Sequence, residues 1–320
     1  MKKIMNITTC AEDTGRYTDR ADLQSFFRGY GLDGLEVMQA GVFAPPVIGP
    51  ADVIGVHLRY WPGWMDFWRQ DVLRLELEYG DLETCWRHYG GRTPSVLEDA
   101  CRQDLAFANT MAPEYLVYHV SDCSMIESMR RKYHYRDDEV IDATAALCNA
   151  VTGEIEGSPW LLFENLWYPG LTMLDPEMTA RLLAQVRYPK CGVMLDTGHL
   201  MHTNPALRTP DEAVDYIHKI LDRYGDLSFI KGIHLHQSLT GAVAMDLMQH
   251  WQPVPGDYQT RIWEVIGHIF QVDLHQPFAT PRVQELIDRI QPAYLVLELI
   301  SSDRPMHADL LRQQVKFLGK

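Results

Sequence analysis

The stretch Gly192-Val-Met-Leu-Asp196-Thr-Gly-His199 leads from an apolar run directly into a carboxylate and an imidazole. A short apolar run of this kind is typical of a buried strand in a parallel sheet. A carboxylate at the end of such a strand must be paired, ligated or hydrated, because an isolated buried charge is very costly. The stretch therefore predicts a strand that carries chemically active groups at its C-terminal end.

Three other apolar runs end in the same way. Trp160-Leu-Leu-Phe-Glu164 and Tyr294-Leu-Val-Leu-Glu298 end in glutamates, and Phe229-Ile-Lys-Gly-Ile-His234 ends in a histidine. Carboxylates and imidazoles are ligands of divalent cations, and strand ends that converge on one cation would all be satisfied together. The four strand ends therefore predict a metal site.

Strand patterns alternate with amphipathic stretches along the whole chain. Helix start signals include Asp175-Pro, Thr280-Pro before 283–290, and Thr209-Pro-Asp-Glu212, which is a capping box. The predicted strands are 3–9, 34–38, 52–58, 115–120, 160–164, 191–196, 229–235 and 294–299. Strict alternation means parallel strands, and eight of them favour an α/β fold of the (β/α)8 TIM barrel type with enlarged βα loops. No Gly-x-Gly-x-x-Gly motif follows the first strand, which argues against a dinucleotide-binding sheet.

Composition is consistent with one cytoplasmic enzyme domain over residues 1–320. A chain of this length buries roughly 75% of its unfolded surface in a single core. The 43 acidic against 29 basic residues, a net charge of -14, oppose broad binding to nucleic acid. The six cysteines include no Cys-x-x-Cys pair, the N-terminus lacks a signal-peptide pattern, and no apolar run would span a membrane.

Four further ionisable residues follow apolar runs. His57 ends Val53-Ile-Gly-Val-His57, His119 ends Tyr115-Leu-Val-Tyr-His119, and Asp273 and His275 form an Asp-x-His pair. Any one of these histidines is more often a core or loop residue than a ligand, but their joint pattern favours ligands. Nine such groups exceed what one ion can use, because catalytic zinc takes three protein ligands and a water. We therefore expect two or three divalent ions, with zinc favoured and manganese or magnesium as alternatives.

The motifs at 196–199, 232–235 and 272–275 resemble those of the xylose-isomerase-like TIM barrel superfamily, and most closely its endonuclease IV branch, AP endonuclease family 2. That resemblance implies three zinc ions. The first would be held by His57, His119 and Glu164, the second by Glu164, Asp196, His234 and Glu298, and the third by His199, Asp273 and His275. His236 competes with His234 for one of these positions.

The resemblance implies metal-dependent hydrolysis of a phosphoester, with Glu164 and Glu298 as catalytic residues. Closely spaced metal ions lower the pKa of a bound water and stabilise the phosphate oxygens in the transition state. Glu164 would bridge two ions beside the attacking hydroxide.

Aromatic and basic residues in the predicted loops bear on the substrate. The predicted binding residues are Tyr60, Trp61, Trp64, Trp167, Tyr168, Arg130 and Arg131. The aromatic side chains either seal the loops to the barrel or bind a bulky planar group, and the basic residues form either a solvated loop or an anion clamp. With an insertion at about 236–272, the second interpretation favours a small-molecule phosphodiester such as a cobamide nucleotide loop, and hence a cobamide-remodelling phosphodiesterase with a corrinoid partner.

Three alternatives stay open. A sugar isomerase or epimerase would use one divalent ion at Glu164, Asp196, His234 and Glu298, with the two glutamates moving a proton. This alternative gives the additional histidines no metal role. An abasic-site endonuclease fits the motifs but not the negative net charge of the chain. This charge makes nucleic acid an unfavoured partner. A non-catalytic binding barrel would be expected to have lost ligands, and all nine residues are present.

Overall fold

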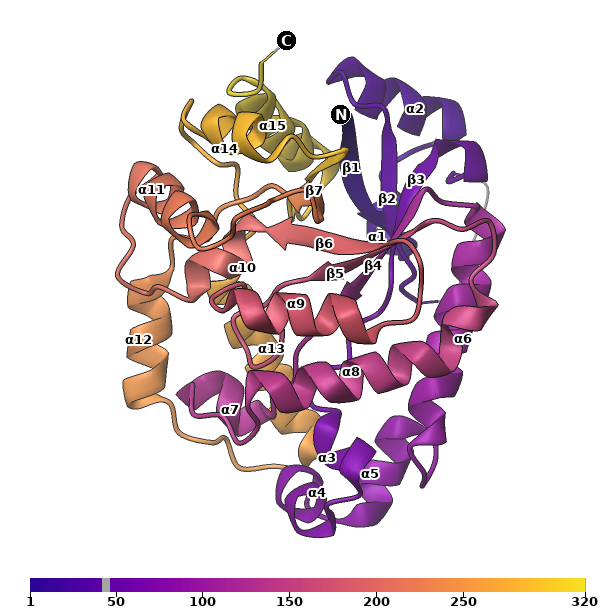
Figure 1. Ribbon diagram of the computed structural model, residues 1–320, viewed down its shortest axis with the longest axis vertical. Coiled ribbons are helices and arrows are strands. Elements are labelled where there is room, and N and C mark those ends of the chain that lie inside the picture. The colour runs from indigo at the N-terminus through magenta and orange to yellow at the C-terminus, as the bar shows by residue number, and fades with distance from the viewer. Residues whose placement is uncertain (42–46, 320) are drawn as a thin grey trace.

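The computed structural model describes residues 1–41 and 47–319, and its centre is a closed barrel of parallel strands (Figure 1). Within these residues eight strands pair in chain order, and β8 closes on β1. The strands are β1 (Lys2–Thr8), β2 (Gly34–Met38), β3 (Val53–His57), β4 (Tyr115–His119), β5 (Trp160–Glu164), β6 (Cys191–Asp196), β7 (Ile230–His234) and β8 (Tyr294–Leu297). The predicted (β/α)8 barrel is confirmed, because each predicted strand overlaps one of these.

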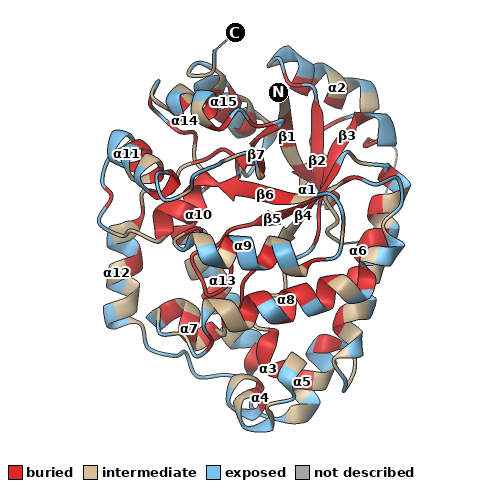
Figure 2. Ribbon diagram, viewed as in Figure 1, coloured by how far each residue is buried: buried red, intermediate tan, exposed pale blue. Residues whose placement is uncertain are grey.

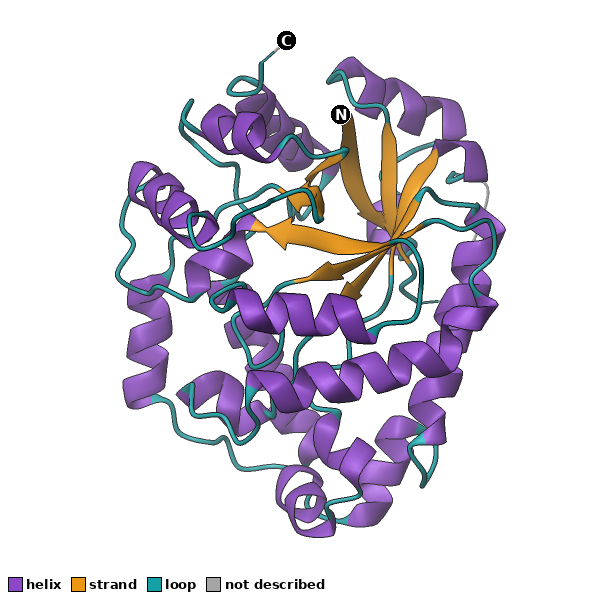
Figure 3. Cartoon of the chain, in the orientation of Figure 1, coloured by secondary structure: helices purple, strands orange, loops and turns teal. Residues whose placement is uncertain are grey.

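Helices connect the strands and surround the barrel (Figure 3). They are α1 (Ala11–Thr14), α2 (Arg20–Gly29), α3 (Met65–Arg69), α4 (Val72–Tyr79), α5 (Leu82–Tyr89), α6 (Ser95–Met111), α7 (Met125–Arg130), α8 (Asp137–Val151), α9 (Pro176–Gln185), α10 (Thr197–His202), α11 (Pro210–Leu221), α12 (Gly241–His250), α13 (Tyr258–Val272), α14 (Val283–Ile290) and α15 (Arg304–Val315), with 3-10 turns at Pro50–Asp52 and Thr152–Glu154. The predicted capping box begins α11, where Thr209 accepts from the backbone of Glu212.

Two apolar layers hold the barrel together. The larger layer lies between the strands and the helices, whose outer faces are exposed (Figure 2). The smaller layer fills the barrel interior and consists of Ile4, Ile54, Tyr115, Val117, Leu162, Met194, Tyr294 and Val296. Because alternate residues of a strand point to opposite faces, the inward-facing positions continue upward from this layer into the ionisable residues at the strand ends.

The long connection from β7 to β8 contains α12, α13 and α14. The segment predicted as an insertion, about 236–272, forms α12 and α13, and these two helices contact each other and α7. The basic run expected to be a loop instead starts within α7, which ends at Arg130.

Within residues 1–41 and 47–319, no helix is long and apolar enough to cross a membrane. All six cysteines are free thiols.

Candidate metal centre

Four ionisable residues from the ends of β5 to β8 form the centre of the site, and we call Glu164, Asp196, His234 and Glu298 the strand group. Each offers one atom that lies within 4.8 Å of the corresponding atoms of the other three. The strand register produces this arrangement, because Asp196 lies opposite His234 in the β6–β7 pair and Glu298 directly follows β8. His234 Nδ1 lies 3.3 Å from Glu164 Oε1 and 3.3 Å from Glu298 Oε2.

The strand group contains three buried polar atoms without a hydrogen-bond partner among the described residues. They are Glu164 Oε1, His234 Nδ1 and Glu298 Oε2. Unpaired buried polar atoms are costly, and in folded proteins most of them have a partner. A cation between these atoms would satisfy all three at once. The residues present therefore fit a divalent metal ion.

His57 and His119 flank the strand group on the β3 and β4 side. His57 Nε2 lies 3.0 Å and His119 Nε2 3.2 Å from the second oxygen of Glu164, Oε2. Burial alone would raise the pKa of Glu164, but the neighbouring His119 and His234 imidazoles outweigh it and hold this pKa well below its usual value. His57, His119 and Glu164 form a second set whose atoms could hold an ion.

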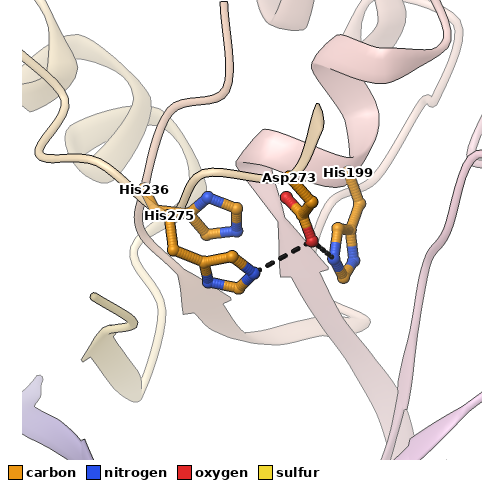
Figure 4. A group of neighbouring side chains, drawn as sticks. All are labelled: His199, His236, Asp273 and His275. Atoms are coloured by element: carbon orange, nitrogen blue, oxygen red, sulfur yellow. Dashed lines mark hydrogen bonds and ion pairs between the residues drawn. The ribbon is translucent and has the colours of Figure 1, made fainter. Parts of the chain in front are cut away.

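A third set lies beside the strand group and comes mostly from loops; we call His199, His236, Asp273 and His275 the loop cluster (Figure 4). Asp273 Oδ2 lies 3.2 Å from His199 Nε2 and 3.0 Å from His275 Nε2. The His236 ring stacks on that of His275 with centroids 3.8 Å apart. The structure thus brings together the predicted ligands His199, Asp273 and His275, and places His236 beside them.

The polar atoms of the loop cluster are largely satisfied by protein groups. His199 Nδ1 donates to the carbonyl of Asn165 at 3.0 Å, and His275 Nδ1 donates to that of Glu298 at 3.1 Å. Ser238 donates to the other oxygen of Asp273 at 3.1 Å. Burial lowers the pKa of His275, but the carboxylates of Asp273 and Glu298 outweigh it and raise this pKa to about 9. Protein groups therefore satisfy most of the polar atoms of this cluster.

The structure separates His234 from His236. His234 ends β7 and directs Nδ1 into the strand group, whereas His236 lies two residues further and donates Nε2 to Asp196 Oδ2 at 2.8 Å. His234 is therefore the residue of β7 that belongs to the strand group.

One residue of the site, Glu36 of β2, was missed from the sequence. It is buried at 2% exposure, accepts from the Tyr115 hydroxyl at 2.7 Å and lies 3.0 Å from His234 Nε2. The signal was present, because a carboxylate interrupts the apolar run Gly34-Leu-Glu-Val-Met38. Glu36 lies in the middle of its strand, whereas the ionisable residues that predict the site follow the ends of apolar runs. Glu36, His57, His234 and Glu298 form a further set that could hold an ion.

The predicted aromatic binding residues are packed into the loops above the barrel. Tyr60 and Trp64 are both hydrogen-bonded to Ser121, at 2.8 and 2.9 Å. Trp167 and Tyr168 are buried against each other, with ring centroids 4.7 Å apart. These contacts correspond to the interpretation in which the aromatic residues seal the loops.

The remaining predicted binding residues make contacts with protein groups. Trp61 stacks on Tyr89 with ring centroids 5.7 Å apart. The guanidinium of Arg130 lies 5.8 Å from the centroid of the Trp251 ring, and Arg131 donates to the carbonyl of His202 at 2.9 Å. A role for any of these residues in substrate binding stays a prediction.

No protein-family model and no curated protein matches the chain. Among solved structures, it is similar to a D-tagatose 3-epimerase-like protein, with 13% identity over 99% of this chain and 96% of that one and a TM-score of 0.53. The two chains share the (β/α)8 barrel fold. Two weaker likenesses are a putative xylose isomerase from Rhodospirillum rubrum (15% identity, 98% and 96% covered, TM-score 0.49) and 3-keto-D-glucoside 4-epimerase from E. coli (11%, 98% and 98%, 0.48). The superfamily predicted from the motifs and its endonuclease IV branch both stay predictions.

The predicted phosphoester hydrolase is wrong. A solved structure that this chain matches over nearly its whole length is a D-tagatose 3-epimerase-like protein, which agrees with the alternative interpretation and not with a phosphodiesterase. The physical reason lies in the loop cluster, to which the hydrolase assigned the third ion. Its residues already bond to one another and to neighbouring carbonyls, so the right residue types for a third ion do not by themselves require one. The cobamide substrate followed from the hydrolase and loses its basis with it.

Proposed function

We propose that this protein is a divalent-metal-dependent sugar isomerase or epimerase whose catalytic centre is the strand group. One observation carries the proposal. Four consecutive strand ends each direct one ligand atom to a common point, and three of these atoms have no hydrogen-bond partner among the described residues. The fold shared with a D-tagatose 3-epimerase-like protein supports this proposal.

The donor set favours a hard cation. Three carboxylates and one imidazole surround the common point. A site rich in carboxylates suits Mg²⁺ and Mn²⁺ better than a site rich in histidine does. We therefore narrow the expected two or three zinc ions to one Mn²⁺ or Mg²⁺ in the strand group. When bound, such an ion supplies Lewis-acid polarisation of a carbonyl oxygen.

Glu164 and Glu298 would move the proton. Isomerisation and epimerisation next to a carbonyl require removal of a proton from carbon and its return, and a positioned carboxylate performs each of these steps. Both carboxylates approach His234 Nδ1 to 3.3 Å, so they lie beside the same point. Glu298 is 9% exposed whereas Glu164 is fully buried, so Glu298 is the carboxylate that an arriving substrate contacts first.

The structure gives a role to the histidines outside the strand group, to which the epimerase interpretation had assigned no metal. His57 and His119 hold Glu164 Oε2, which leaves Oε1 directed into the site. His236 donates to Asp196 Oδ2, and the backbone of His199 donates to Asp196 Oδ1. Partners that orient ligating carboxylates contribute to metal affinity without binding the ion themselves.

Incubation with a panel of ketoses and aldoses in D2O tests the proposal. Protein loaded with Mn²⁺ should form an epimer or isomer, and deuterium should enter the substrate at the carbon that loses its proton, as measured by NMR after removal of the metal. Glu298→Gln should abolish both signals, while Glu83→Gln, an exposed glutamate of α5, should leave them unchanged. Absence of product and of deuterium exchange across the panel, in protein shown to bind the ion, would contradict the proposal.

A further inference from the structure

We propose that Glu36 is a positioning residue for the metal centre, acting through His234 and held in turn by Tyr115. This inference rests on the proposed function, because it assumes an ion in the strand group. The three residues come from β2, β7 and β4, so the arrangement crosses the barrel interior directly below the site.

His234 has two ring nitrogens with different surroundings. Nδ1 is directed into the strand group, while Nε2 lies 3.0 Å from Glu36 Oε1. His234 is fully buried and Glu36 is almost so. A carboxylate at Nε2 keeps the proton on that nitrogen, so the lone pair of Nδ1 faces the metal. Glu36 therefore fixes both the tautomer and the orientation of the imidazole.

Tyr115 holds this carboxylate at Oε2, the oxygen to which His234 Nε2 also donates at 3.2 Å. Its hydroxyl donates to Glu36 Oε2 at 2.7 Å, and its ring lies in the apolar interior layer against Tyr294, with centroids 4.4 Å apart. The hydroxyl thus prevents Glu36 from turning away from His234.

Gly55 of β3 determines where the Tyr115 ring lies. A Cβ atom at this position would overlap the ring and its hydroxyl. A glycine inside a strand often marks such a close approach. The apolar run Val53-Ile-Gly-Val-His57 therefore provides both the space for Tyr115 and, at its end, a histidine that holds Glu164.

Glu36 could instead bind an ion directly, with His57, His234 and Glu298. The hydrogen bonds favour the positioning role. Glu36 Oε2 already accepts from both His234 Nε2 and Tyr115, and Oε1 lies 3.0 Å from the same nitrogen, whereas the unpartnered atoms belong to the strand group. An ion is therefore expected on the Nδ1 side of His234, with Glu36 behind the ring.

Metal affinity provides the test. Mn²⁺ is titrated into metal-free protein in competition with a chromophoric chelator, which gives the Kd independently of activity. Glu36→Gln should weaken binding roughly 10- to 100-fold, the usual effect of removing a partner of a ligating histidine. Tyr115→Phe should weaken Mn²⁺ binding by less, within about tenfold. This variant keeps the proposal testable if Glu36→Gln does not fold.

Tyr294→Phe is the matched control. It removes the same hydroxyl from the other tyrosine of the same interior layer, which interacts with Glu114. Its Kd for Mn²⁺ should equal that of the wild type.

Nitrogen NMR of histidine-labelled protein loaded with diamagnetic Zn²⁺ reads the tautomer. The wild type should show His234 protonated at Nε2, and Glu36→Gln should lose or shift this signal. An unchanged Kd in both Glu36→Gln and Tyr115→Phe would overturn the positioning role and leave the proposed function intact. A wild type that binds no ion would overturn both. Complete loss of binding in Glu36→Gln with none in Tyr115→Phe would make Glu36 a ligand instead.

Discussion

The strand group and the loop cluster contain the same kinds of side chain, but they differ in how their polar atoms are satisfied. In the strand group, three of the atoms that face the common point have no hydrogen-bond partner among the described residues. In the loop cluster, Asp273 is shared by two imidazoles and a serine hydroxyl, and in the described structure only His236 Nδ1 lacks a partner. The strand group therefore leaves buried atoms that a cation would satisfy, whereas protein groups satisfy nearly all of the loop cluster.

If the proposed function holds, this difference teaches that residue types alone overestimate the number of metal ions. Nine histidines and carboxylates at strand ends suggested two or three ions. The proposed function places one ion in the strand group and leaves the other residues to hold its ligands or one another. Substitutions in the strand group should therefore reduce kcat and metal binding, whereas substitutions in the loop cluster should reduce the free energy of unfolding.

The largest effect is expected in the strand group. Glu298→Gln should lower kcat of the proposed epimerisation by roughly 10²- to 10⁴-fold, because it removes a proton-transferring carboxylate. Steady-state kinetics at saturating Mn²⁺ measures this effect, with Glu83→Gln as control. Activity within a few-fold of the wild type would exclude Glu298 from the chemistry.

Metal removal should destabilise the protein through the strand group. At a free ion concentration of 100 times Kd, binding adds about 2.7 kcal/mol to the free energy of unfolding. A chelator should therefore lower Tm of the wild type. The same treatment should not change Tm of Asp196→Ala, which has lost a ligand of the strand group. Equal shifts in both proteins would place the ion elsewhere.

In the loop cluster, the expected effect is on stability and not on chemistry. His275→Ala leaves Asp273 buried with one partner fewer, which should lower the free energy of unfolding by about 1–3 kcal/mol. Urea denaturation of metal-free protein measures this loss. The kcat of the proposed reaction should stay within a few-fold of the wild type. A loss of kcat as large as that of Glu298→Gln would remove the distinction between the two groups.

The smallest effect is expected at the edge of the loop cluster. Ser238 donates to Asp273 at 3.1 Å and accepts from the backbone of Leu274 at 3.0 Å. Ser238→Ala should lower the free energy of unfolding by about 1 kcal/mol, with an unchanged Kd for Mn²⁺. A change in that Kd would show that the loop cluster contributes to the ion site.

The sequence was sufficient to predict the barrel and the place of the site, because strand ends in a parallel barrel all face one side. Glu164, Asp196, His234 and Glu298 could be identified since each follows an apolar run. Glu36 was not found, because its importance depends on facing His234 across the barrel, and such a contact has no signature within one strand.

The reaction was predicted wrongly for a related reason. Residue types and spacing placed His199, Asp273 and His275 together, and the structure places them together as well. Whether they need an ion depends on their hydrogen-bond partners, such as the carbonyls of Asn165 and Glu298, and these cannot be read from the sequence. The choice between His234 and His236 likewise required the end of β7 to be known.

The number of ions bound per chain tests the central claim most directly. Elemental mass spectrometry of protein saturated with Mn²⁺ and then freed of loosely bound ion should give one equivalent for the wild type. It should also give one equivalent for His275→Ala and none for His234→Ala. Two or more equivalents in the wild type, or loss of the ion in His275→Ala, would contradict the account.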